Sequence, residues 1–418
     1  MTDARTTPLS PAHTARPGTT GPAAGATPTW WVWLAAWPVT AVFVLSNAAT
    51  PLYVLWQDSI GFSKGTLTVI FAFYIVGLLA SLLVSGVASD RLGRKAVLLP
   101  ALALGLIACL VFATADSVAA LIVARLFTGI AVGAVVSAGM AAVTDVAGAG
   151  RKRLAALLAS CAMVFGAGLG PLLAGIFAQT LPGPTVTVFI VEAALLLTAI
   201  ATVLRMPLRR PETAATGRWI RVPGVPAAGR HPLLVGIATF GPGITATSFV
   251  LSLGPLLLAS LLHSSSRILA GATAFVMFAA ATGTQFAVQH VARGTVLLAS
   301  ASCTVASMVA LVGAVHANSV ILLVAAALLA GAGQGMGQLA GLSLLNAVVP
   351  PTRLAEANAA LNVGGYVPAG LLPVSAGYLS DAVGLTTGST VFAAVLGALA
   401  LTGGAVVMVT RHRLVEPS

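Results

Sequence analysis

The chain has 418 residues, of which 58% are hydrophobic and 7% are charged, and its formal net charge is +11 at pH 7. A soluble protein carries roughly 25% charged residues, because its surface must stay hydrated. The composition therefore excludes a soluble globular protein and indicates a chain that crosses a membrane many times. The positive charge does not indicate a nucleic-acid partner, since the basic residues stand in short segments between apolar runs.

The N-terminal segment 1–29 is rich in Thr, Pro, Ala and Gly and has no continuous apolar stretch. It is predicted to be a disordered cytoplasmic tail and not a signal peptide. Twelve continuously apolar segments follow, each long enough for a helix to cross a hydrocarbon core of about 30 Å. They span about 31–56, 66–89, 96–115, 118–146, 153–179, 185–206, 233–262, 268–290, 294–315, 318–348, 356–380 and 387–410. An all-α polytopic membrane fold with twelve transmembrane helices is therefore expected.

The basic residues are distributed unequally between the two sides of these spans. With the N-terminus inside, eighteen of the 21 Lys and Arg residues are cytoplasmic, Lys64 and Arg267 lie outside, and Arg125 lies within a span. Because positive residues are retained on the cytoplasmic side, both termini are predicted to be cytoplasmic. The longest polar segment, 207–232, separates six spans from six. We therefore expect helical bundles at 30–206 and 233–410, a cytoplasmic linker at 207–232 and a cytoplasmic tail at 411–418.

The segment 86–98, between the second and third spans, reads GVASDRLGRKAVL and is the densest charged cluster between two apolar runs. Gly86 has no side chain and allows helix 2 to approach a neighbour, while Gly93 permits a tight turn. The charged members of the cluster are Asp90, Arg91, Arg94 and Lys95. Their positive residues resist translocation and hold this turn in the cytoplasm.

Three motifs resemble those of the major facilitator superfamily. The segment 86–95 resembles the signature loop between helices 2 and 3 of that family, and RLFTGIAVG at 125–133 is similar to its helix-4 motif. The segment 166–175 resembles the helix-5 motif of the drug:proton antiporters of the family, and it contains Gly166, Gly170, Pro171 and Gly175. The resemblance covers residues 30–413. It implies two pseudo-symmetric six-helix bundles around a central substrate site.

The resemblance also implies a cytoplasmic gate. Asp90 would face the positive N-terminal end of helix 11 near residues 356–358, and Arg94 would pair with Asp145. The expected gating residues are Gly86, Asp90, Arg91, Gly93, Arg94, Lys95 and Asp145. The alternative is that the loop only fixes the topology. The helix-5 motif is expected to seal an interface and to favour export, and ordinary helix packing is its alternative.

Two charged residues lie deep inside predicted spans, the base Arg125 and the acid Glu192. A charge near the bilayer centre costs about 2.5–3.5 kcal/mol on insertion scales, so each should face a cavity or a partner. Both are expected to act in proton coupling. The alternatives are a structural cation satisfied by backbone carbonyls for Arg125 and a neutral, hydrogen-bonded acid for Glu192.

Polar side chains recur on single faces of several spans. Asn47 and Thr50 are three residues apart, and Gln334 and Gln338 are four apart, so each pair shares a helix face. Buried amides are costly unless they are hydrated or paired, which indicates a neutral, amide-rich cavity or, alternatively, interhelical hydrogen bonds. The expected cavity residues are Asn47, Thr50, Tyr53, Tyr74, Gln285, Gln334, Gln338, Asn358, Asn362 and Tyr366. Such a cavity suits an uncharged or weakly polar organic compound, and Arg125 leaves an anion as the alternative.

These features predict a secondary active transporter and not an enzyme, since the sequence has no phosphate-binding loop, metal-ligand spacing or nucleophile constellation. The expected activity is proton-coupled export of a small organic compound, a drug or a metabolite, by a monomer in the cytoplasmic membrane of a bacterium. No cofactor, metal or nucleic acid is expected. Uptake by symport or uniport is the main alternative, favoured by the few titratable residues in the spans. A non-transporting receptor or scaffold is a more distant one.

Overall fold

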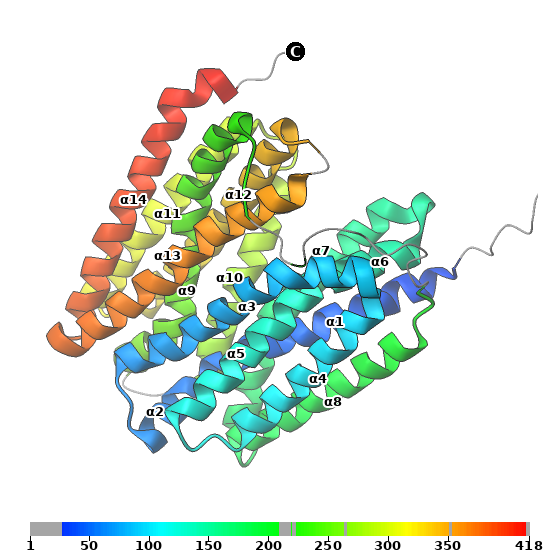
Figure 1. Cartoon of the computed structure of the whole chain (residues 1–418). Coiled ribbons are helices and arrows are strands. Elements are labelled where there is room, and N and C mark those ends of the chain that lie inside the picture. Colours follow the sequence, from blue (N-terminus) through cyan, green and yellow to red (C-terminus); the bar gives the residue numbers. More distant parts are fainter. Residues whose placement is uncertain (1–26, 209–218, 220–222, 263–265, 351–352, 415–418) are drawn as a thin grey trace, which may run out of the picture.

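The structure is a computed structural model that describes residues 27–208, 219, 223–262, 266–350 and 353–414. Over these residues the chain is helical, and only short turns join the helices (Figure 1). Three predicted segments lie wholly or partly outside the described residues. They are the N-terminal tail up to residue 26, the linker at 209–218 and 220–222, and the C-terminal tail from residue 415.

The first half of the chain forms six membrane-length segments. The first combines α1 (Thr29–Ala48), the 3-10 turn η1 (Thr50–Leu52) and α2 (Tyr53–Ile60), so the expected continuous helix is interrupted where Pro51 cannot donate a backbone hydrogen bond. The fourth combines α5 (Val118–Ala134), a π-helical turn η2 (Val135–Gly139) and α6 (Met140–Ala147). The remaining elements are α3 (Lys64–Leu92), α4 (Arg94–Ala113), η3 (Ala149–Arg151), α7 (Lys152–Thr180) and α8 (Pro184–Arg205).

The second half also forms six long helices, which confirms the predicted number of helical segments. These elements are η4 (Ala227–Gly229), α9 (Arg230–Leu262), α10 (Arg267–Ala287), α11 (Arg293–His316), α12 (Val320–Val348), α13 (Leu354–Val383) and α14 (Leu385–Leu414). Among the described residues, eleven segments are long and apolar enough to cross a membrane. The twelfth segment, α13, has 30 residues and is therefore long enough, but its Asn, Gly and Pro residues lower its mean hydropathy.

Within each half the helices pack closely into a bundle. In the N-terminal bundle, α3 packs along α5 and α1 packs along α7, and in the C-terminal bundle α12 packs against α9 and α11. The contact between α3 and α5 depends on Gly129, because a Cβ atom at this position would collide with the carbonyl oxygen of Tyr74. At this glycine α5 therefore packs tightly against α3.

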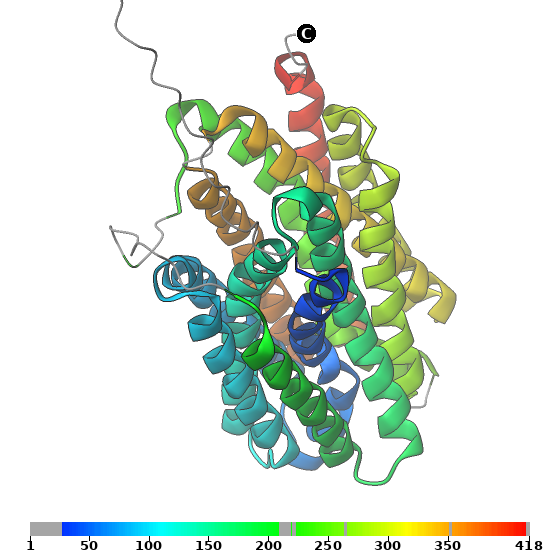
Figure 2. The same ribbon diagram turned by 90° about the vertical axis from the view of Figure 1, so that its right-hand side faces the viewer.

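The two bundles touch through α3 with α13 and through α7 with α10. Because an even number of spans returns the chain to its starting side, α1 begins and α14 ends at the same end of the molecule, which we call the terminal end (Figures 1 and 2). The opposite end, where α3 and α10 begin and α7 and α13 end, is called the far end. The ribbons of the bundles converge at the far end and diverge toward the terminal end (Figure 1).

Candidate functional site

A cavity lies between the two bundles, about halfway along the helices that form it. Its walls come from α1, α3 and α7 of the N-terminal bundle and from α9, α10, α12 and α13 of the C-terminal bundle. The space that water can occupy is about 130 Å³, far more than the about 10–15 Å³ that a single water needs. Both bundles of one chain therefore enclose a site large enough for a small organic molecule.

The cavity contains no charged side chain among its described lining residues. Six of its polar or aromatic residues were predicted from the sequence: Asn47, Tyr74, Gln285, Gln334, Gln338 and Tyr366. Ser46, Thr247, Ser248 and Thr282 add hydroxyl groups. The side-chain oxygen of Gln334 is buried and has no hydrogen-bond partner, so it is available to a donor in the cavity.

Sequence reasoning missed the apolar part of this lining. Phe43, Phe71, Met163 and Phe278 line the cavity together with Tyr74 and Tyr366. An aromatic or Met residue in a transmembrane span is equally compatible with lipid contact or helix packing, so its type carries no signal for a cavity. The observed lining combines flat aromatic surfaces with amide groups, which suits a ring compound that carries hydrogen-bonding groups.

The other four predicted cavity residues do not line this cavity. Thr50 is buried and lines a much smaller pocket between η1, α9 and α10, and Tyr53 is buried against Arg125. Asn358 and Asn362 share a face of α13 with Tyr366, but Asn358 precedes Tyr366 by two helical turns, about 12 Å. A shared helix face therefore placed the pair on the correct side of α13 but at the wrong depth.

Arg125 is fully buried in the N-terminal bundle, behind the aromatic wall of the cavity. Its Nη1 donates a hydrogen bond of 2.7 Å to the carbonyl oxygen of Ser46, and its Nε donates to the hydroxyl of Tyr53. The guanidinium carbon lies 5.4 Å from the ring centre of Phe71 and 5.9 Å from that of Tyr74, both of which line the cavity. The Nη2 atom is buried without a hydrogen-bond partner.

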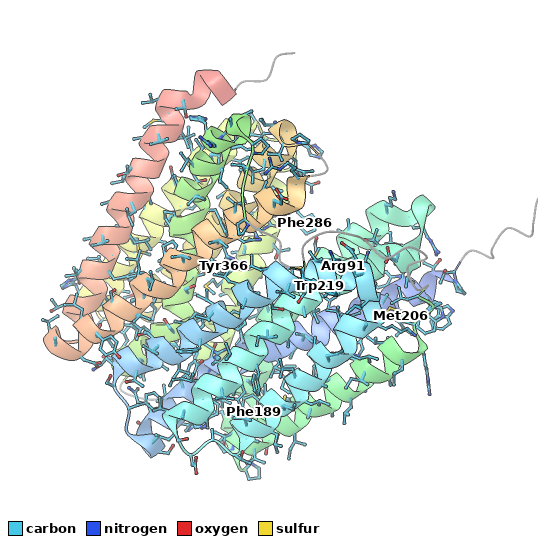
Figure 3. All side chains as sticks on the ribbon, in the orientation of Figure 1. Arg91, Phe189, Met206, Trp219, Phe286 and Tyr366 are labelled. Atoms are coloured by element: carbon cyan, nitrogen blue, oxygen red, sulfur yellow. The ribbon has the colours of Figure 1, made fainter. Side chains whose placement is uncertain are left out.

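Glu192 lies elsewhere, on α8 at the side of the N-terminal bundle. Only 3% of its surface is exposed, and its Oε2 atom is buried with no hydrogen-bond partner. One turn earlier, Phe189 stacks on Phe112 with ring centres 4.7 Å apart. Figure 3 shows Phe189 well separated from Tyr366 at the cavity. Glu192 is therefore buried in apolar surroundings, and the structure does not bring it to the cavity.

The charged loop after α3 folds back on the N-terminal bundle. Gly93 has φ +93°, a conformation that favours glycine, so the expected tight turn is present. Arg94 donates to Asp145 on α6 at 2.9 Å, as expected, and also to Asp90 at 2.5 Å. Lys95 donates to the carbonyl oxygen of Leu204 at the end of α8.

The other members of the predicted gate lie beside this ion-pair cluster. Gly86 is on α3, one turn before Asp90. The guanidinium of Arg91 lies 4.5 Å from the ring centre of Trp219, next to it in Figure 3. At the start of α13, Arg353 pairs with Glu356 at 3.0 Å. A contact between Asp90 and this end of α13 stays a prediction.

The helix-5 motif lies on α7 and serves two different contacts. Gly166 and Gly170 face α1, where a Cβ atom at Gly170 would collide with the carbonyl oxygen of Val44. Gly175 faces the other bundle, where a Cβ atom would collide with the carbonyl oxygen of Arg267 on α10. The carbonyl of Pro171 also lies against α10, at Gly271. The motif therefore packs α7 within its own bundle and across to the second one.

Two helical bundles with a cavity at their interface define the architecture of a secondary transporter. Residues 32–294 match the sequence profile of the Major Facilitator Superfamily, and the chain belongs to this family. Its fold is the two-bundle fold of these transporters, and the protein is a multi-pass membrane protein. No curated protein sequence matches the chain.

Several solved structures share the fold. A bacterial homologue of the human lysosomal transporter Spinster, in an inward-facing and occupied conformation, superposes with a TM-score of 0.73 at 12% identity, covering 95% of this chain and 100% of that chain. The nucleoside transporter NupG gives 0.69 at 13% identity, covering 90% and 98%. A D-xylose-proton symporter gives 0.69 at 16% identity, covering 90% and 97%. At these identities the similarity concerns the fold.

Proposed function

We propose that this transporter exports an uncharged, ring-containing organic compound, a drug or a metabolite, in exchange for protons. The observation that carries the proposal is the central cavity, where the lining residues that the structure describes are aromatic rings, amides, hydroxyls and apolar groups, with no charged side chain among them. A neutral ligand would lose little solvation energy in such a site, whereas a charged ligand would leave its charge unpaired. Because one chain supplies the whole lining, the monomer is the functional unit.

The proposed direction of transport rests on the helix-5 motif, which resembles that of drug:proton antiporters. Its residues Pro171 and Gly175 lie against α10, so the motif contributes to the contact between the bundles at the far end. The excess of Lys and Arg at the terminal end supports a cytoplasmic location for that end in a bacterial inner membrane. The far end would then be the outer side, and the bundles are held together on that side.

The cluster of Asp90, Arg94 and Asp145 supports a role for the loop after α3 in the inner gate. Each charge in it has a partner within the N-terminal bundle. When the bundles close at the terminal end, Asp90 at the end of α3 would meet the positive N-terminal end of the α13 helix dipole. Alternating access would then exchange one set of contacts for the other during each cycle.

Proton coupling is proposed to involve Arg125 and Glu192, each of which has a buried polar atom without a partner. Glu192 carries the proton and Arg125 senses the occupied cavity through Phe71 and Tyr74. The test uses purified protein in liposomes with an imposed pH gradient and a panel of neutral ring compounds. Wild-type protein should move a compound against its concentration gradient only when the pH gradient is present.

Glu192→Gln should abolish the gradient-driven accumulation and keep downhill exchange of the compound, because the amide cannot carry the proton. Asp116→Asn, which neutralises an exposed acid in the loop between α4 and α5, is the matched control and should keep the accumulation. Accumulation by Glu192→Gln at the wild-type level would remove Glu192 from the mechanism.

Uptake is the second candidate function. It is favoured by the shared fold with a nucleoside transporter and a D-xylose-proton symporter, and the hydrogen-bonding amides of the cavity would also suit such polar neutral solutes. The same liposomes decide between the two. A compound and protons that move in the same direction indicate symport, and movement in opposite directions indicates the proposed exchange.

A further inference from the structure

We propose that Asp381 and Gln179 form a two-point latch at the far end, in which each bundle caps the first turn of a helix in the other. Alternating access requires the bundles to separate at this end in one part of the cycle, so contacts here set the balance between the two states. The proposal depends on the fold and not on the direction of transport or on its coupling to protons.

The first point of the latch is Asp381, near the end of α13. Its Oδ1 accepts a hydrogen bond of 2.9 Å from the backbone N–H of Lys64, and its Oδ2 accepts one of 2.8 Å from the N–H of Gly65. The ammonium of Lys64 lies 3.7 Å from Oδ1. These N–H groups are at the start of α3, where they have no partner within the helix and where a negative charge is favoured.

The second point is Gln179, near the end of α7. Its Oε1 accepts a hydrogen bond of 3.1 Å from the backbone N–H of Ile268 at the start of α10. Arg267, the first residue of α10, donates to the carbonyl oxygen of Ala178 at 2.9 Å. The N-terminal bundle therefore holds α10 in the way that the C-terminal bundle holds α3.

The two points are related by matching sequence patterns in the two halves. Each capped helix begins with Ser and a basic residue, Ser63-Lys64 and Ser266-Arg267, and each Ser caps its own helix through the side chain. Each acceptor stands four residues after a glycine, in Gly175-x-x-x-Gln179 and Gly377-x-x-x-Asp381.

Those two glycines set the distance between the helices. A Cβ atom at Gly377 would lie 2.9 Å from the carbonyl oxygen of Lys64, and one at Gly175 would collide with the carbonyl oxygen of Arg267. At these glycines α13 closely approaches the first residue of α3, and α7 closely approaches the first residue of α10. One helical turn later, Asp381 and Gln179 reach the free N–H groups of those two helices.

The carboxylate of Asp381 is ionised when it acts. Asp381 lies beyond the apolar span 356–380 and keeps 26% of its side chain exposed. Burial raises the pKa of Asp381, but the N–H groups of Gly65 and Lys64, the Ser63 hydroxyl and the Lys64 charge together outweigh burial and lower it below its usual value. The side chain of Asp381 is therefore charged at neutral pH, whereas the side chain of Gln179 carries no charge at any pH.

The test measures how often the far end opens, by the reactivity of a buried reporter thiol. Thr273→Cys on α10 is the reporter, because Thr273 is 4% exposed and lines the small pocket beneath the far-end contact. The background carries Cys161→Ser and Cys303→Ser, since Cys109 is buried. A maleimide reacts with the full-length, purified protein in detergent at pH 7, and the rate is followed over time.

Asp381→Ala and Gln179→Ala should each raise the labelling rate about two- to five-fold, the effect expected when a helix N-terminus loses its capping group, and the double variant should raise it about ten-fold. Asp116→Ala removes an exposed acid from the loop between α4 and α5 at the same end and should leave the rate unchanged. Rates for all latch variants equal to that of Asp116→Ala would overturn the proposal.

Two further variants keep the test decisive if an alanine variant fails to fold. Asp381→Asn retains an oxygen acceptor but loses the charge, so its rate should lie between those of the wild type and Asp381→Ala. Gln179→Leu removes the acceptor and keeps the size of the side chain, and it should match Gln179→Ala. Because the readout is thiol labelling and not flux, a negative result here would leave the proposed transport function untouched.

Discussion

At the scale of the residue, Arg125 shows what a sequence can and cannot predict. Its depth in an apolar span predicts burial with a partner, and the structure confirms the burial. Its partners could not be predicted, because Ser46 and Tyr53 belong to the first span, and which face of that span meets Arg125 depends on how the bundle packs. The orphaned Nη2 atom has no signal in the sequence at all.

The hydrogen bonds of Arg125 predict a large effect for a conservative substitution. Arg125→Lys keeps the positive charge but cannot donate to Ser46 and Tyr53 in the same fork geometry. Hydrogen bonds to a charged group contribute about 1.5–3 kcal/mol each, so flux in liposomes should fall at least tenfold.

Tyr53→Phe is the matched control for Arg125→Lys, because it removes one of the two partners and should cost less flux than the Lys variant. Size-exclusion profiles would show that both variants are folded. Wild-type flux in Arg125→Lys would show that the guanidinium geometry has no part in transport.

At the scale of the element, the spans were predictable and their irregularities were only partly so. Continuous apolar runs predict all twelve helices, but nothing in the run 118–146 marks the π-helical turn η2 in its interior. The helix-5 motif predicts that α7 packs tightly. Which neighbour each glycine faces depends on the rotation of α7, and that rotation becomes visible only when α1 and α10 are in place.

The contact of Gly170 with α1 predicts a loss of stability. Gly170→Ala would place a methyl group against the carbonyl oxygen of Val44, and overpacking of this kind costs about 1–3 kcal/mol. The Tm of the detergent-purified protein should therefore fall. Gly283→Ala on α10 is the control, because a Cβ atom there has open space, and its Tm should be unchanged or slightly higher. Equal Tm values for both variants would contradict the packing assigned to Gly170.

At the scale of the whole molecule, the sequence predicts the class of protein and the position of the cavity between the bundles. It predicts less well which residues line that cavity. The division into six and six spans, together with the motifs, leads to the family that the comparison confirms. Six of ten predicted cavity residues line the cavity. Thr50, Asn358 and Asn362 lie elsewhere because a shared helix face gives a direction but not a depth relative to the other bundle, whereas the side chain of Tyr53 turns to Arg125 within its own bundle.

The contacts between the bundles were also hidden in the sequence. Lys64 and Arg267 are predictable as the two basic residues on the sparsely charged side, but only the assembled bundles show that each begins a helix capped from the other half. Interactions between residues more than 80 positions apart depend on the docking of the halves, which local patterns do not encode.

In the proposed transport cycle, solutes cross the membrane through the cavity between the bundles, so a side chain that fills the cavity should block their passage. Gln338→Trp would place an indole in the about 130 Å³ cavity, while Ser302→Trp would place it in a lateral groove between α11 and α14. Compound flux into liposomes under a pH gradient is measured for both variants and the wild type. Gln338→Trp should lose flux and Ser302→Trp should keep it, whereas wild-type flux in folded Gln338→Trp would show that solutes do not pass through this cavity.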